Sequence, residues 1–142
     1  MPIAGSLALI SALAFAIPAQ DRPAQEPPSR GTWKMVAVVV DGREVPLGPT
    51  TTMTVTADGF TVMVDRKVQS KGTAKTDSSK NPVQSDVTIT EGPTAGTMIR
   101  QIGKVEGDIL IACQAQPGGD RPTGFVSKPG SHHVLSVWIR SE

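Results

Sequence analysis

The chain has 142 residues and a formal net charge of +1, from 14 lysine and arginine residues against 13 aspartate and glutamate residues. The two signs are interspersed and no basic stripe is visible, so the composition argues against nucleic-acid binding. Cys113 is the only cysteine, which excludes an internal disulfide and leaves core packing to hold the domain together.

Residues 3–17 are apolar or small throughout, a run too short to span a bilayer but typical of the core of a secretory signal peptide. Cleavage is expected after Ala19, where polar residues begin, although Ala16 also fits the small-residue rule. We therefore expect a signal peptide at residues 1–19 and an exported protein, periplasmic or extracellular, with no stable membrane insertion after cleavage. Because no lysine or arginine precedes the apolar run, an N-terminal membrane anchor and a mis-assigned start codon stay open as alternatives.

Residues 20–30 are polar and rich in proline, which is typical of a disordered spacer before a domain at residues 31–142. From Gly31 onward the composition changes. Residues 33–40 favour β-structure and end at Asp41-Gly42, a strong turn signal.

The next two segments predict a β-hairpin. Residues 51–57 and 60–65 each alternate between apolar and polar side chains, and Asp58-Gly59 separates them. Period-two alternation on both sides of an Asp-Gly pair indicates two antiparallel strands with one face turned inward. The side chains expected to point inward are Met53, Val55, Ala57, Phe60, Val62 and Val64.

The remainder of the chain continues the same pattern, with no window of helical periodicity. Further strands are expected at residues 68–76, 86–90, 97–105, 108–114 and 133–140. About eight short strands with regular turn signals predict an all-β fold, and mostly short connections favour a small antiparallel up-and-down β-barrel. Closure into a barrel would remove the exposed edges of a flat sheet.

Several segments of the domain resemble the lipocalin-like (calycin-type) domain family of unknown function that is abundant in planctomycete bacteria. These segments are Gly31-Thr32-Trp33-Lys34, Asp41-Gly42 with Val45-Pro46, Asn81-Pro82, residues 86–93, Gly107-Asp108 with Leu110 and Cys113, Arg121-Pro122-Thr123 with Phe125, and Arg140. The resemblance covers residues 31–140 and implies a lipocalin-like barrel, but no reaction. One departure is Gly103, which stands where the family often has tyrosine.

Trp33 and Arg140 are expected to close one end of the barrel. We expect the guanidinium to lie across the indole and to bond nearby carbonyl groups, because arginine stacks on aromatic faces and keeps its charge. A role in a ligand pocket is the alternative for this pair.

The function predicted from this fold is non-catalytic binding of a small, largely apolar ligand at the open end of the barrel. The residues expected to line that site are Met53, Val55, Val62, Val64 and Met98. The alternative is an extracytoplasmic protein–protein interaction module with a filled barrel and an exposed apolar patch. An enzyme is least supported, because no motif combines a nucleophile, a base and oxyanion donors.

The remaining reactive side chains favour structural roles. Cys113 lies in an apolar run and is expected in the core. His132 and His133 are the only histidines and would point to opposite faces of a strand, so no metal site is expected, although carboxylates could complete one. No other cofactor is expected. The family-like segments also hold four carboxylates, for which a paired acid/base role is the alternative. Asp86, Glu91 and Asp108 border turns and are expected to bond backbone amides there. Asp120 is expected in a fixed loop of residues 120–123, in which Arg121 pairs with a carboxylate.

Overall fold

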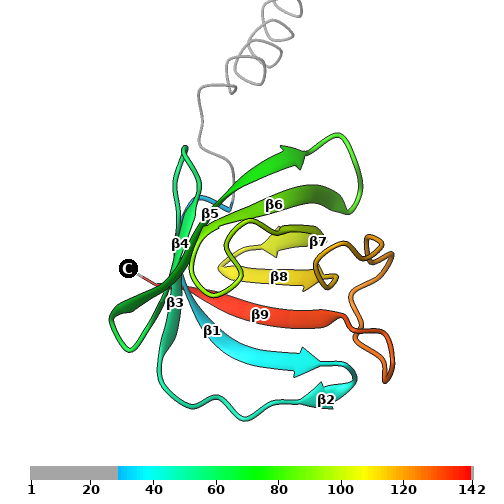
Figure 1. The fold of residues 1–142 in the computed structure, drawn as a ribbon, viewed down its shortest axis with the longest axis horizontal. Helices are drawn as coiled ribbons and strands as arrows, with labels where there is room; N and C mark the ends of the chain where they lie inside the picture. Colours follow the sequence, from blue (N-terminus) through cyan, green and yellow to red (C-terminus); the bar gives the residue numbers. More distant parts are fainter. Residues whose placement is uncertain (1–28, 142) are drawn as a thin grey trace, which may run out of the picture.

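A computed structural model describes residues 29–141, so the predicted signal peptide and most of the predicted spacer lie outside the described residues. Within this part, the chain forms nine strands and no helix (Figure 1). They are β1 (Gly31–Val40), β2 (Arg43–Glu44), β3 (Thr51–Val55), β4 (Phe60–Val64), β5 (Lys67–Asp77), β6 (Val83–Glu91), β7 (Met98–Glu106), β8 (Ile109–Gln114) and β9 (Val134–Ser141). Accordingly, no helix in residues 29–141 is long and apolar enough to cross a membrane.

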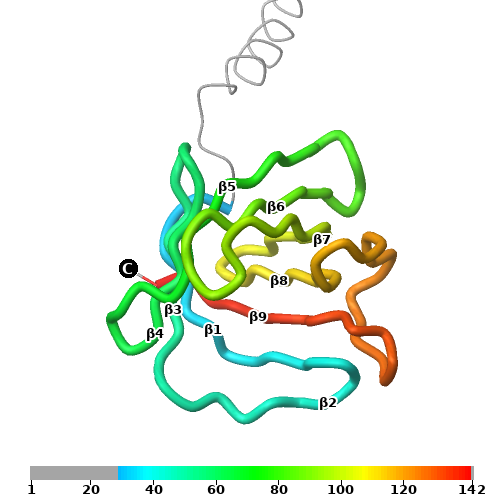
Figure 2. The backbone as a smooth tube through the Cα atoms, viewed as in Figure 1, coloured from blue at the N-terminus to red at the C-terminus, as the bar shows by residue number. Residues whose placement is uncertain are grey.

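The strands form one closed antiparallel barrel. From β3 to β9 each strand pairs with the next in sequence, β1 pairs with β3, and β9 returns to pair with β1 over nearly its full length. The backbone trace in Figure 2 shows β1 and β9 side by side at this closure. The all-β up-and-down barrel is thus confirmed, with eight strands in the closed ring and the two-residue β2 as an addition beside β1.

Two tight turns place residues with positive φ between paired strands. Asp41 and Gly42, with φ of 51° and 85°, join β1 to β2 as the Asp-Gly signal predicts. Asp65 and Arg66, with φ of 55° and 71°, join β4 to β5 in the same way. Because this second turn contains no glycine, the sequence lacks the Asp-Gly pattern that marks the first turn.

The interior of the barrel contains two apolar clusters. Trp33, Leu110 and Trp138 form the first, and Met35, Met53, Val55 and Val105 pack against it. Val87, Ile89 and Ile99 form the second, against which Phe60 packs. The face that carries these clusters is called the inner face below, and residues two apart along a strand share it.

A long connection, residues 115–133, covers part of the outer face. Ile102 and Cys113 alternate with inner-face residues and pair with each other across β7 and β8, yet both are buried. The Cys113 Sγ lies 3.6 Å from the backbone oxygen of Val126, and Pro122 of the same connection is fully buried. In addition to the two clusters inside the barrel, the domain therefore has a small core outside it, beneath this connection.

Gly72 on β5 lets the ring of Phe60 approach the sheet closely. The pairing of β5 with β6 shifts register between Lys71 and Gly72, so Gly72 adjoins a bulge. A Cβ atom at Gly72 would lie 2.7 Å from Cζ of Phe60 and closer still to the backbone oxygen of Thr88. The absence of a side chain here is a packing requirement of the second apolar cluster.

We expect Gly72→Ala to lower the free energy of unfolding by about 1–3 kcal/mol, because the methyl group would push Phe60 and the β6 backbone out of place. Denaturant unfolding measures the effect. Gly48→Ala is the matched control, since no atom lies within 4 Å of a Cβ built there, and it should stay within about 0.5 kcal/mol. Equal stabilities for the two variants would contradict the packing requirement.

Candidate functional site

The structure stacks Arg140 on Trp33 at one end of the barrel. The two residues are register partners on β9 and β1, and the guanidinium carbon lies 4.2 Å from the indole centroid. The indole is fully buried, and its Nε1 donates a hydrogen bond of 2.9 Å to the backbone oxygen of Ser29. The Arg140 guanidinium also donates to the backbone oxygen of Arg30 at 3.0 Å.

Two further residues fit around this stack. Gly31 has a φ of 126°, and a Cβ there would lie 2.9 Å from the Arg140 guanidinium. Asp108, which the sequence assigns only to a turn, places its carboxylate 3.5 Å from Nε of Arg140. The side chain of Arg140 thus contacts Trp33, the carbonyl group of Arg30 and Asp108, which supports a structural role at this end rather than an open pocket.

Replacing Arg140 by alanine should lower the free energy of unfolding by about 1–3 kcal/mol, because the stacking is lost and the carbonyl group of Arg30 loses its donor. Arg140→Lys keeps the charge but loses the planar stack, so its stability should lie between those of the parent protein and Arg140→Ala. Arg43→Ala, at an exposed position on β2, is the control for loss of an arginine. A thermal midpoint that is unchanged by Arg140→Ala would contradict the structural role.

Four of the five residues predicted to line a ligand site lie on the inner face. Met53 pairs with Trp33 and, like Val55, packs against the first apolar cluster, so these two side chains serve the core. Val62 and Val64 share the same face, because Val62 is the register partner of Met53 and Val64 of Thr51. Both valines are half-buried, and neither is among the residues that pack against the Trp33 cluster.

Met98 is the exception, and its predicted inward direction is wrong. It pairs with the exposed Thr88, and its neighbour Ile99 takes the inner position opposite Val87. Met98 is 41% exposed on the outer face. It borders a depression there of about 330 Å³. Adjacent Met98 and Ile99 are both apolar, so alternation alone could not decide between them.

Away from Trp33, the inner face is open because one wall of the barrel is short. β3 pairs with β1 only over Gly31–Lys34, so the rest of β1 has no β3 partner. Figure 1 shows β3 and β4 at one side of the molecule, with β6 to β9 and β1 extending away from them. The inner face of these extended strands is called the open inner face below.

Two rows of paired residues make up the open inner face. The first row runs across five strands through Val83, Gly103, Ala112, Ser136 and Val38. The second runs beside it through Ser85, Gln101, Gln114, Val134 and Val40. Neither row contains an ionisable side chain, and the centre of the first row is formed by three small residues. Most of these residues are only half-buried.

Gly103 is the residue of this surface that leaves most room. Its backbone is ordinary strand, and a Cβ built on it meets nothing closer than 3.6 Å. Beside it in the row, the hydroxyl of Ser136 accepts a 2.9 Å hydrogen bond from Nε1 of Trp138. The sequence marks this position only as the place where the resembling family often has tyrosine.

Arg121 fixes the long connection to the outer face of the barrel. Its guanidinium donates hydrogen bonds of 2.9 Å to the backbone oxygens of Ser85 and Gln101. It also pairs with the carboxylate of Asp86 at 2.5 Å. The predicted pairing of Arg121 with a carboxylate is confirmed. The carboxylate of Asp86 therefore helps to anchor the long connection to the barrel.

The Cys113 thiol is fully buried, as the sequence predicts for a core residue. Burial raises the pKa of this thiol, because the low-dielectric surroundings disfavour the thiolate. A thiol held in its protonated form is a poor nucleophile. The geometry therefore supports packing rather than reactivity for Cys113.

Labelling of Cys113 by a thiol reagent in the native protein should be limited by the rate of unfolding, and fast modification would contradict its burial.

The raised pKa of Cys113 also gives the free energy of unfolding a pH dependence of defined sign. Above about pH 8.5 the unfolded thiol ionises while the folded one stays protonated, so stability falls as pH rises. The Cys113→Ala variant has no thiol and lacks this loss. Between pH 7 and 10, the free energy of unfolding of the parent should therefore fall relative to that of the variant, as measured by denaturant unfolding at each pH.

The two histidines contribute mainly through their backbone. The His132 amide donates to the Asp41 carboxylate at 2.9 Å, which holds the pKa of Asp41 below its usual value. The His133 carbonyl accepts from the hydroxyl of Ser127 at 2.8 Å. Residues 29–141 contain no group of three or more His, Cys, Asp or Glu side chains placed to hold a metal ion.

A second surface of apolar side chains lies where β1 meets the segment after β2. Val36, Val45 and Leu47 are 39%, 38% and 44% exposed. Together with Ala37, Glu44 and Pro46 they line a shallow depression of about 440 Å³.

Comparisons of the chain with protein-family models, curated proteins and solved structures gave no match. The resemblance to the planctomycete lipocalin-like family therefore stays a prediction from the sequence.

Proposed function

We propose that this chain is an exported, non-catalytic binding protein of the lipocalin-like barrel type, and that its ligand is small, largely apolar and uncharged. The ligand lies on the open inner face, next to Gly103. The observation that carries the proposal is the neutral lining of this surface, where two rows of residues cross five strands without an ionisable side chain.

The chemistry of the two rows defines the ligand class. Val38 and Val40 at one edge, and Ala112 in the centre, offer apolar contact to the body of a ligand. The amides of Gln101 and Gln114 are register partners and offer both donors and acceptors to a single polar group. A charged ligand would lose its hydration here without gaining an opposite charge, which disfavours it.

A protein–protein interaction module is the second candidate, and the apolar surface of β1 and the segment after β2 supports it. Exposed apolar side chains that lie together, such as Val36, Val45 and Leu47, are typical of interaction surfaces. The two candidates use different surfaces of the molecule, so variants can separate them.

Native mass spectrometry of the full chain, before and after exposure to a lipid extract, should show a discrete added mass that organic solvent removes. Gly103→Tyr should abolish this mass, because the ring would cover the centre of the first row. The variant should fold, since tyrosine favours strands and Gly103 has an ordinary strand backbone. Thr73→Tyr, at an exposed outer position on β5, is the matched control and should retain the ligand.

An unchanged added mass in Gly103→Tyr would contradict the placement on the open inner face. A clean mass without ligand under both conditions would contradict the ligand proposal itself. In that case Leu47→Ser should be tested for loss of a protein partner, because Leu47 is more exposed than Val36 and Val45 beside it.

A further inference from the structure

A third surface, separate from the open inner face and from the apolar surface around Leu47, lies on the outer face at the start of β7. It is the depression of about 330 Å³ that Met98 borders, and its other lining residues are Thr97, Arg100, Pro117, Gly118 and Gly119. The last three come from the long connection, whose Gly118 amide lies 3.4 Å from the backbone oxygen of Met98. The connection and β7 together therefore form the walls.

Arg100 is the only ionisable residue in this lining, and its charge is poorly compensated. Arg100 is a half-buried residue, and its guanidinium donates one long hydrogen bond, 3.4 Å, to the backbone oxygen of Gly119. Within residues 29–141 no carboxylate lies within 4.0 Å of it. A guanidinium has five N–H donors, so most of its capacity is available to a ligand.

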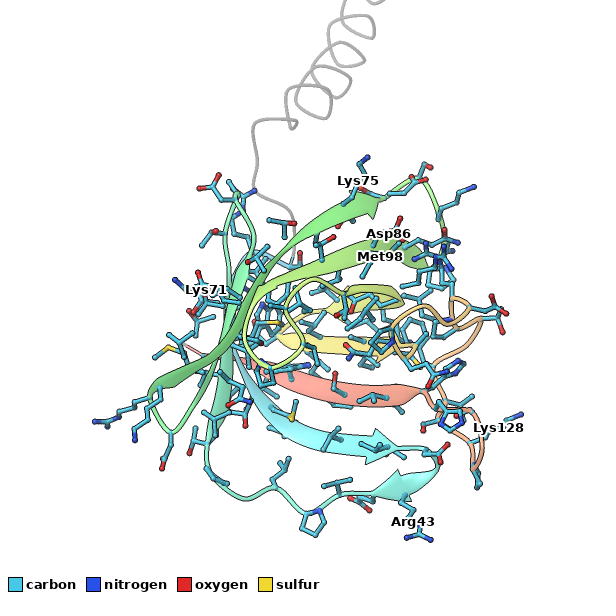
Figure 3. The ribbon with its side chains drawn as sticks, in the orientation of Figure 1. Arg43, Lys71, Lys75, Asp86, Met98 and Lys128 are labelled. Atoms are coloured by element: carbon cyan, nitrogen blue, oxygen red, sulfur yellow. The ribbon has the colours of Figure 1, made fainter. Side chains whose placement is uncertain are left out.

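The neighbouring carboxylate does not neutralise Arg100. Asp86 is the register partner of Arg100 across β6 and β7, but its carboxylate pairs with Arg121. Figure 3 labels Asp86 and Met98, which lie on these two adjacent strands. Asp86 therefore balances the charge of Arg121, and the positive charge of Arg100 remains beside an exposed methionine.

We propose that this depression binds a small organic carboxylate with a short apolar tail. The carboxylate pairs with the guanidinium of Arg100, for which two-oxygen acceptors have the matching geometry. The tail lies against Met98 and Pro117, since the methionine thioether adapts to ligands of irregular shape. A single guanidinium matches a single negative charge, which favours a carboxylate over a phosphate. This site is independent of the proposed neutral ligand of the open inner face.

The test uses the full chain with methyl-labelled methionine, and hexanoate as the probe. Hexanoate should shift the Met98 methyl resonance in a saturable manner, and methyl hexanoate, which has no charge, should bind at least about tenfold more weakly. Arg100→Gln should weaken hexanoate binding by about tenfold or more. Arg43→Gln, an exposed arginine on β2, is the matched control and should bind as the parent does.

The following outcomes would overturn the proposed carboxylate site. They are equal affinities for hexanoate and its methyl ester, unchanged binding in a folded Arg100→Gln variant, and a saturable shift confined to methionines other than Met98. Gly103→Tyr separates this site from the proposed function, because it should block the neutral ligand and leave hexanoate binding intact. Inorganic phosphate that competes as well as hexanoate would contradict the assigned ligand class.

Discussion

The pairing of β1 with β9 is the constraint on which the remainder of the structure depends. It joins the first and last strands of the domain, and without it both would present open edges. With one cysteine, the chain has no disulfide to hold this closure. Two tryptophans, Trp33 on β1 and Trp138 on β9, are instead buried beside it. The stack of Arg140 on Trp33 covers the end of the same pairing.

Closure also fixes which side of every strand faces inward. A slip of one residue in strand pairing would move each side chain to the opposite face. The buried tryptophans therefore determine the register of β1 and β9. Each further strand is then fixed by its hydrogen bonds to its neighbour. The outer face then carries its own requirement. Ile102 and Cys113 point outward in this register and need a cover, which the connection of residues 115–133 provides. Arg121 holds that cover in place through Asp86.

The sequence predicts this fold well where local signals are strong and poorly where they are ambiguous. Asp41-Gly42 marks a turn because glycine and aspartate tolerate positive φ, whereas Asp65-Arg66 forms one without glycine. Residues 109–113 are all apolar, so alternation could not show that Leu110 faces inward and Cys113 outward. The same ambiguity explains why Met98 was predicted to face inward, whereas its neighbour Ile99 takes the inner position. The two proposed binding surfaces depend on which residues share a row or a wall, which is a property of register and of the long connection.

A single strand, β7, contributes to both surfaces and separates their chemistry. Gly103 points to the open inner face, and Arg100, three residues earlier, points to the outer depression. Because neighbouring residues alternate across the sheet, the guanidinium can lie beside Met98 without placing a charge on the neutral inner rows. A charge on the open inner face would have to be desolvated against valine and alanine, and neither of its two rows holds an opposite charge to offset that cost. The sheet therefore allows one small domain to offer an uncharged surface and a cationic surface, with only the thickness of the backbone between them.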